Sequence, residues 1–423
     1  MLFDIGAILA MTMLGYLVYL ALFERGAFYT ASEQLHTLDD NERLRMLSAV
    51  LATPIQPIES VQLINEGAEL YQCQVKTVST AQHSVHCEAY IFRAGDAADA
   101  LLQALCERAR NGVRVRVMID GIGSLGTRNA LFDSLIAAGG EVRRYHPIHW
   151  HLFRRWNNRT HRNLLVVDGV TAFVGGAGVA DQWFRPELPW RDCQLRITGP
   201  VAAGLQAVFA ENWLECTGQM LVGPDSFPRV DPLQASPSVV SLGIAVGSSP
   251  TAGGSTRARV LFQLLLASAS ETIDLSSPYF IPDLGIRQEL LAARNRGVRV
   301  RILTSGRHND HRIARRAGRR RYGLLLEGGI EISEFSTRMM HAKVLVVDGR
   351  WSIVGSTNID NRSFRLNDEV NLLVLDQILG TALQQAFEDD LAHSVALDLE
   401  SWRRRSWTER ALALLGRVLE RHH

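Results

Sequence analysis

The stretch that decides the fold is His341-Ala-Lys-Val-Leu-Val-Val-Asp-Gly349, followed by Trp351-Ser-Ile-Val-Gly-Ser-Thr-Asn358. The apolar run 344–347 is typical of a buried strand, and Asp348-Gly349 is a strong signal for a hairpin turn. Residues 351–354 then predict the return strand. The sequence therefore predicts a β-hairpin whose two ends carry polar residues.

Four polar side chains are expected to meet at the open end of this hairpin, opposite its turn. His341 and Lys343 are two residues apart, so their side chains leave a strand on the same face. The return strand brings Ser356 and Asn358 back beside them. An imidazole, an ammonium, a hydroxyl and an amide thus converge, which is a set suited to holding a tetrahedral oxyanion beside a nucleophile or a proton donor.

Much of this unit occurs twice in the chain. His161-Arg-Asn-Leu-Leu-Val-Val-Asp-Gly169 resembles the stretch that begins at His341, and Asn111-Gly-Val-Arg-Val-Arg-Val117 recurs as Arg296-Gly-Val-Arg-Val-Arg-Ile302. Each copy places a strand-like run and a helical pattern before these pieces. Alternating strands and helices in two equivalent halves predict an α/β fold with buried, valine-rich strands.

The repeats and the composition shifts between them divide the chain. A proline-containing stretch with few apolar runs separates the halves and is expected to be a linker. The predicted order is a membrane anchor (1–25), a juxtamembrane helical segment (26–80), a first domain (81–222), the linker (223–240), a second domain (241–398) and a basic amphipathic tail (399–423).

The N-terminal part contains an uncharged run of 19 residues, 5–23. As a helix it would be about 28 Å long, close to the thickness of a bilayer's hydrocarbon core. We expect one transmembrane helix here; a cleaved signal peptide and a buried core helix are the alternatives. Arginines 25, 43 and 45 follow the run, which by the positive-inside rule places the remaining chain in the cytoplasm.

Composition limits the classes of function. The 45 basic and 44 acidic residues nearly cancel, which argues against a protein that coats nucleic acid by bulk charge. Only two of the basic residues are lysines, Lys76 and Lys343. The five cysteines form no Cys-x-x-Cys pair, which argues against a zinc ribbon and suits a reducing compartment.

The spacing His341-x-Lys343-x-x-x-x-Asp348, followed by Gly355-Ser356-x-Asn358, resembles the signature of the phospholipase D superfamily. Neighbouring stretches, including Ser277-Pro-Tyr-Phe-Ile-Pro282 and Asn367-Asp-Glu-Val-Asn371, are most similar to its bacterial cardiolipin synthase branch. The resemblance implies two phospholipase D-like α-β-α sandwich domains in a pseudo-two-fold arrangement, with one active site at their interface. It also implies a reaction without a metal or a cofactor.

The resemblance further implies roles for individual residues. One of His161 and His341 would attack phosphorus and the other would protonate the leaving alkoxide; we assign the attack to His161, although the order stays open. Asp192 and Glu369 resemble the carboxylates that orient these histidines. The expected catalytic residues are His161, Asp168, His341, Lys343 and Asp348, and the expected phosphate-binding residues are Asn163, Ser356 and Asn358.

The first copy departs from the pattern. Asn163 stands where the motif lysine belongs, Gly178 stands where the asparagine belongs, and Gly175-Gly176 replaces Gly-Ser. One side of the phosphate site thereby lacks a cation and an amide, and nearby Arg159 or Arg162 is a candidate to supply the missing charge. A catalytically impaired, lipid-binding homologue is therefore an alternative to an active enzyme.

The resulting functional expectation is phosphatidyl transfer through a phosphohistidine, forming cardiolipin from two phosphatidylglycerols with release of glycerol. Hydrolysis of phospholipid or nucleic acid by the same chemistry is the alternative, since water can also release a phosphohistidine. We expect anionic phospholipid and a membrane as partners and no nucleic acid. The expected location is the bacterial inner membrane, with the catalytic domains facing the cytoplasm.

Two basic stretches are candidates for contact with anionic headgroups. Residues 307–321 hold seven arginines, and helical spacing would gather five of them on one face. Residues 402–421 combine an arginine triplet with tryptophans and an apolar stripe. This tail could lie in a membrane interface or pack on the protein itself.

Overall fold

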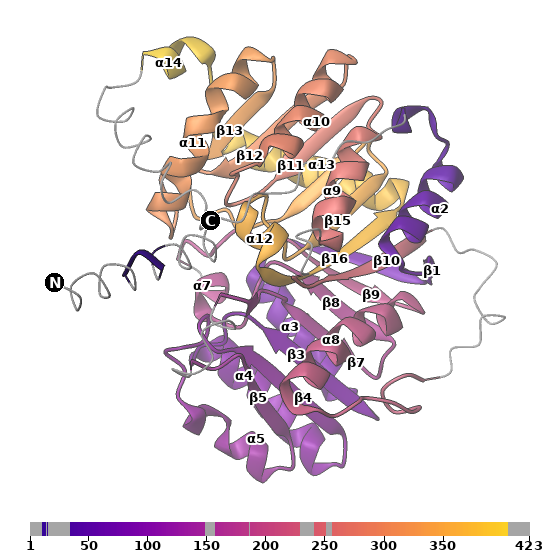
Figure 1. Ribbon diagram of the computed structural model, residues 1–423. Helices are drawn as coiled ribbons and strands as arrows, with labels where there is room; N and C mark the ends of the chain where they lie inside the picture. Colours follow the sequence, from indigo (N-terminus) through magenta and orange to yellow (C-terminus); the bar gives the residue numbers. More distant parts are fainter. Residues whose placement is uncertain are drawn as a thin grey trace, which may run out of the picture.

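The computed structural model describes residues 11–13, 15, 34–148, 157–185, 187–228, 241–250 and 256–404. Two α/β halves lie against each other, and each contains a central sheet between layers of helices (Figure 1). The predicted pair of α-β-α sandwiches is present. The two sheets differ by three strands, because a strand from the N-terminal part of the chain, a strand near residue 395 and one short strand from the first half add to the second.

The sheet of the first half has seven strands. Three strands at one edge are parallel, since β3 pairs with β4 and β4 with β5, and the remaining pairs are antiparallel. Every residue of β3 is buried, as expected for a strand covered on both faces. The strand order is β2 (Ser60–Ile64), β9 (Gln194–Thr198), β8 (Thr171–Gly175), β7 (Leu164–Val167), β3 (Ser84–Ala89), β4 (Arg114–Asp120) and β5 (Glu141–Tyr145).

The sheet of the second half repeats this order and extends it. Its strands are β1 (Gln56–Ile58), β10 (Ser241–Ser248), β16 (Asn367–Leu375), β15 (Trp351–Gly355), β14 (Val344–Val347), β11 (Thr272–Ser276), β12 (Arg299–Ser305), β13 (Glu331–Phe335) and β17 (Ser394–Leu397). The tenth strand, β6 (Arg159–Thr160), comes from the first half and pairs with β16 in parallel. This pairing fastens the two halves together beside His161.

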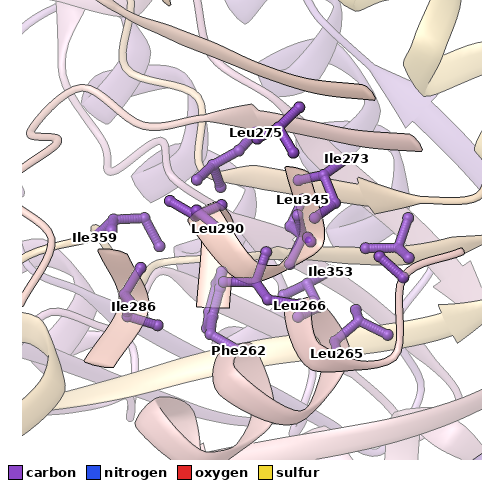
Figure 2. Packing of buried hydrophobic residues seen from close by; sticks show 14 of the residues in the cluster. Phe262, Leu265, Leu266, Ile273, Leu275, Ile286, Leu290, Leu345, Ile353 and Ile359 are labelled. Atoms are coloured by element: carbon purple, nitrogen blue, oxygen red, sulfur yellow. The ribbon is translucent and has the colours of Figure 1, made fainter. Parts of the chain in front are cut away.

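Helices cover the outer face of each sheet. In the second half, Figure 2 shows Phe262 and Leu265 of α9 (Arg257–Ala267) packed among side chains from α10 (Leu284–Asn295) and strands β11, β14 and β15, such as Leu290 and Leu345. The outer helices of the first half are α3 (Gly67–Ser79), α4 (Asp96–Arg110), α5 (Asp133–Ala137) and α7 (Asp181–Phe184). Those of the second are α2 (Asp40–Leu51), α9 (Arg257–Ala267), α10 (Leu284–Asn295), α11 (Arg312–Glu327) and α12 (Asn361–Arg365).

The inner faces of the two sheets share one apolar core. Helix α8 (Val201–Thr217) follows β9, and helix α13 (Gln377–Ala392) follows the equivalent strand of the second half, β16. Phe209 of α8 and Phe387 of α13 belong to the same buried cluster, together with valines of both hairpins. Because this core contains residues of both halves, the two halves pack together through it.

Both predicted hairpins are present, with residue pairs 168–169 and 348–349 at their turns. Asp168 and Gly169 have φ angles of 53° and 64°, and Asp348 and Gly349 have 52° and 65°. Three residues lie between the last paired positions of each hairpin, 168–170 and 348–350, and the first two of them form the centre of the turn. A turn whose two central residues both have positive φ angles matches the right-handed twist of the strands, which explains the Asp-Gly sequence in both copies.

The described part of the predicted helical segment 26–80, residues 34–80, contributes one strand to each sheet as well as helices. Helix α2 places Leu44 and Leu47 in the outer core of the second half, and β1 pairs with β10. One residue later the chain crosses to the first half, where β2 pairs with β9. The first α/β unit therefore begins before residue 81. The error arose because β1 and β2 are short and have no partner nearby in the sequence.

The predicted C-terminal tail, 399–423, differs from the prediction in its described residues, 399–404. Helix α14 (Leu399–Arg403) packs on α11, and Trp402 is buried with its ring 5.8 Å from that of Tyr322. The tail thus begins inside the second half; residues 405–423 lie outside the described part, as do 229–240 of the linker. Nearly all of the predicted anchor, 5–23, also lies outside it. Within the described residues, no helix has the length and apolar character needed to cross a bilayer.

Two of the arginines predicted to form a basic face on α11 do not contribute to that face. Arg315 and Arg319 point to Glu334 of β13, with hydrogen bonds of 2.6 and 2.5 Å. The guanidinium of Arg319 also lies 5.4 Å from the centre of the Trp402 ring. Arg316 is exposed. Since two of the five arginines pair internally, the face presents less charge than the helical spacing predicted.

Candidate active site

A cavity of about 490 Å³ lies where the two halves meet, and both motif histidines line it. His161 and His341 are 7% and 6% exposed, respectively. Each enters the cavity just before the first strand of its hairpin, so the pseudo-two-fold axis brings the two equivalent positions together. Both histidines therefore share one cavity between the halves, where the resemblance implies the active site.

His161 is held by the second half. Its backbone N–H donates to the carbonyl of Asp368 on β16 over 2.8 Å, which continues the β6–β16 pairing. Its Nδ1 donates to Glu369 over 3.1 Å. Glu369 is fully buried and also accepts from the hydroxyl of Ser356. The ring is therefore oriented with Nε2 free to face the cavity.

His341 is held by the first half in the same manner. Its backbone N–H donates to the carbonyl of Arg191 over 2.6 Å, and its Nδ1 donates to Asp192 over 2.7 Å. Asp192 also accepts from Trp183 Nε1 at 2.9 Å and from the Cys193 amide at 2.8 Å. Burial by itself raises the pKa of Asp192, but the positive charge of His341 and Lys343 and the hydrogen bonds outweigh it, so the pKa is lowered.

The orienting carboxylates are therefore crossed between the halves. The resemblance implies that Asp192 and Glu369 orient the histidines, and a hydrogen bond joins each of them to one histidine. Asp192 comes from the first half and serves His341, whereas Glu369 comes from the second and serves His161. Neither half alone holds an oriented histidine.

Lys343 lies directly beside the ring of His341. Its Nζ donates to the carbonyl of His341 over 2.6 Å and lies 3.2 Å from Nε2 of the same residue. Burial lowers the pKa of Lys343 to about 8, against the opposing effect of Asp192 and Glu369. Burial, followed by the charge of Lys343, also lowers the pKa of His341. The neutral imidazole is thus favoured at this position.

The predicted phosphate-binding residues have different surroundings. Asn358 lines the cavity, and its buried Oδ1 has no hydrogen-bond partner. Asn163 also lines the cavity, but its Nδ2 donates to the Gly176 carbonyl and its Oδ1 accepts from the Tyr90 amide. Ser356 does not line the cavity, because its hydroxyl is turned toward Glu369. Its place is behind the site, as a support for that carboxylate.

The prediction of Asp168 and Asp348 as catalytic residues is wrong. Each lies at the far end of its hairpin strand from the histidine. Asp168 accepts from the backbone N–H groups of residues 82, 83 and 84, and Asp348 accepts from those of residues 270, 271 and 272. These carboxylates fix the starts of β3 and β11. A motif shared by two copies marks structural positions as well as chemical ones.

Several cavity residues were missed by the sequence analysis. Tyr90 packs edge-on against His161, with ring centroids 5.0 Å apart, and Trp190 packs against His341 at 5.1 Å. Asp360 lines the cavity, and burial raises its pKa to about 6. Asp310 also lines it and accepts from the Tyr279 hydroxyl over 2.6 Å. None of these residues belongs to the repeated motifs from which the site residues were predicted.

Fold and site together define a duplicated α/β protein whose two halves share a paired-histidine site for phosphoryl chemistry. A family model described as "Cardiolipin synthase, PLD-like domain" matches residues 75–213 and 263–391. The chain therefore belongs to the cardiolipin synthase family of phospholipase D-like enzymes.

Individual relatives agree with this assignment. The chain is 32% identical over 384 residues to a cardiolipin synthase of Geobacillus kaustophilus, covering 89% of this chain and 75% of the relative. It is 30% identical over 397 residues to a cardiolipin synthase of Halalkalibacterium halodurans, covering 92% and 77%. The resemblance inferred from the motifs is thus confirmed.

Solved structures show the same fold. The phosphatidylserine synthase of Haemophilus influenzae superposes with a TM-score of 0.67 at 16% identity, covering 90% of this chain and 96% of that one. The polyphosphate kinase of Porphyromonas gingivalis superposes with a TM-score of 0.55 at 12% identity, covering 85% and 52%.

Proposed function

We propose that this enzyme transfers a phosphatidyl group between phospholipids, forming cardiolipin from two molecules of phosphatidylglycerol and releasing glycerol. The observation that carries the proposal is the pair of histidines in one cavity, each with its Nδ1 bound to a carboxylate of the other half. Because Nδ1 is occupied, Nε2 of each ring is the atom that meets the substrate.

Two oriented imidazoles support a double displacement. Nε2 of one histidine attacks phosphorus, and the other histidine gives its proton to the departing glycerol oxygen. The same histidine then takes the proton of the incoming hydroxyl, whose oxygen attacks the phosphohistidine and frees the first ring. Holding the phosphatidyl group covalently lets glycerol leave before the second phospholipid arrives.

The two roles need different protonation states at the start: the nucleophile is neutral and the acid carries a proton. The sequence-based assignment gives the attack to His161. The lowered pKa of His341 favours the reverse assignment, because a neutral ring suits attack better than proton donation.

The test is mass spectrometry of the products that the purified chain forms in phosphatidylglycerol vesicles. We expect cardiolipin from the native chain and none from His341→Ala or His161→Ala. His393→Ala is the matched control, since that histidine is exposed and outside the cavity. Phosphatidic acid in place of cardiolipin would instead support hydrolysis. Activity that appears only in Asn163→Lys would identify an impaired first half-site.

We also propose that residues 5–23 anchor the enzyme in the bacterial inner membrane, with the catalytic halves on the cytoplasmic side. The uncharged run and the arginines that follow it support this arrangement. Fractionation of cells that express the full chain or a chain lacking residues 1–25 tests the anchor, and protease protection in spheroplasts tests the side. Equal release of both chains into the soluble fraction would refute the proposal.

A further inference from the structure

The two halves differ in the cation that accompanies the histidine. In the second half Lys343 stands two residues after His341 and lies beside its ring. In the first half the equivalent position is Asn163, whose amide is committed to the Gly176 carbonyl and the Tyr90 amide. The first half-site therefore has no cation where the internal repeat predicts one.

A different cation occupies the opposite side of His161. Arg159 stands two residues before His161, and β6 is extended, so both side chains leave the backbone on the same side. Arg159 lines the same cavity as the histidines and is only 1% exposed. Met339 stands at the corresponding position of the second half. Lys343 thus stands two residues after its histidine, whereas Arg159 stands two residues before its own.

The guanidinium of Arg159 is fixed by its neighbours but retains one free donor. Its Nε donates to both carboxylate oxygens of Asp120, at 3.2 and 3.0 Å. Its Nη2 donates to the carbonyls of Tyr145 and His146, at 2.9 and 2.8 Å. Nη1 is buried and has no partner. A buried charged donor without an acceptor is costly, so an anionic oxygen is the natural occupant.

The other candidate arginine points elsewhere. Arg162 is fully buried, donates to the Val208 carbonyl, Glu211 and Ser249, and does not line the cavity. Arg93 lines the cavity, but it is exposed and donates to Gln182.

We propose that Arg159 is the phosphate-binding cation of the first half-site, and that its Nη1 donates to a non-bridging phosphoryl oxygen during transfer. This inference rests on the proposed phosphatidyl transfer for its substrate. It predicts that a cation on either side of His161 serves the reaction, so that a lysine at position 163 replaces the function of Arg159.

The experiment removes the cation at position 159 of the full chain and introduces one at position 163. Arg159→Met combined with Asp120→Asn removes both members of the buried ion pair, so no carboxylate is left unpaired. The same double variant with Asn163→Lys restores a cation, and Arg93→Met is the control for losing one charge from the same cavity. The readouts are the rate of cardiolipin formation in phosphatidylglycerol vesicles and the calorimetric Kd for inorganic phosphate.

We expect the rate to fall about a hundredfold in the double variant, as for other lost oxyanion donors, and to recover at least tenfold with Asn163→Lys. A purely structural role would not be rescued by a lysine at another position. The inference is overturned if the folded double variant keeps its rate, or if Asn163→Lys restores neither rate nor phosphate affinity. If the native chain forms no cardiolipin, the proposed function fails, and the phosphate Kd alone then decides the role of Arg159.

Discussion

The crossed carboxylates make a quantitative prediction for Asp192→Asn. Asp192 has three neighbours, His341 Nδ1, Trp183 Nε1 and the Cys193 amide, and all of them are donors. An asparagine offers only one accepting oxygen, so its NH₂ group must face at least one donor. Losing a hydrogen bond to a charged acceptor costs about 1.5–3 kcal/mol, and leaving a buried donor unsatisfied adds about 1–3 kcal/mol.

When the new NH₂ group faces His341, the ring is driven to the tautomer that carries its proton on Nε2. That tautomer cannot attack phosphorus or accept a proton. We therefore expect kcat for cardiolipin formation to fall by about 10²–10³, equivalent to about 3–4 kcal/mol. The negative charge of Asp192 raises the pKa of His341, so its removal also shifts the acidic limb of the pH profile to lower pH.

The assay is initial-rate cardiolipin formation in phosphatidylglycerol vesicles at several pH values. Asp389→Asn is the matched control, because this carboxylate is exposed and does not line the cavity that holds the histidines. Denaturant titration of both variants separates catalysis from folding. A folded Asp192→Asn enzyme whose kcat falls less than threefold would refute the idea that this carboxylate sets the ring's protonation.

Three further predictions concern other parts of the site. Replacing Asp168 or Asp348 by alanine leaves several strand N–H groups uncapped, so we expect the free energy of unfolding to drop by about 2–4 kcal/mol with little change in kcat; lost activity at unchanged stability would contradict this. The lowered pKa of His341 predicts that rapid quenching of His161→Ala with labelled phospholipid traps a phosphohistidine on His341, located by peptide mass spectrometry; an adduct on His161 in the native chain would restore the sequence-based order. The ammonium of Lys343 loses its proton as the pH rises through about 8, so kcat/KM is expected to decline above that pH, and a profile that stays flat to pH 10 would exclude a role for its charge.

Local sequence signals predicted the parts of the fold that depend on neighbouring residues. The hairpin at Asp348-Gly349 was correct because an apolar run, a turn pair and a second apolar run suffice to specify it. The same holds for its copy at Asp168-Gly169. The repeat itself indicated two similar halves and one shared site. The catalytic interpretation of both aspartates failed because a turn carboxylate that caps distant strand ends looks the same in sequence as one that touches substrate.

Contacts between distant segments could not be predicted. Nothing near Asp192 in the sequence shows that it serves the histidine of the other half, 149 positions away. In the same way, α2 packs on the second half and β1 pairs with a strand of its sheet, although both come before the first half in the sequence. The arginines of α11 were interpreted as solvent-facing because Glu334, which binds two of them, lies on a different strand. Such pairings are decided by the packing of the whole chain.

The exchange of carboxylates between the halves has the geometry of a symmetric dimer folded into one polypeptide. In a dimer of identical subunits, every substitution would appear on both sides of the axis at once. Here each half consists of its own residues in one chain, so a substitution can occur in one half without occurring in the other. The chain carries Lys343 on one side and Asn163 on the other, so the two histidines of the site can have unequal tasks.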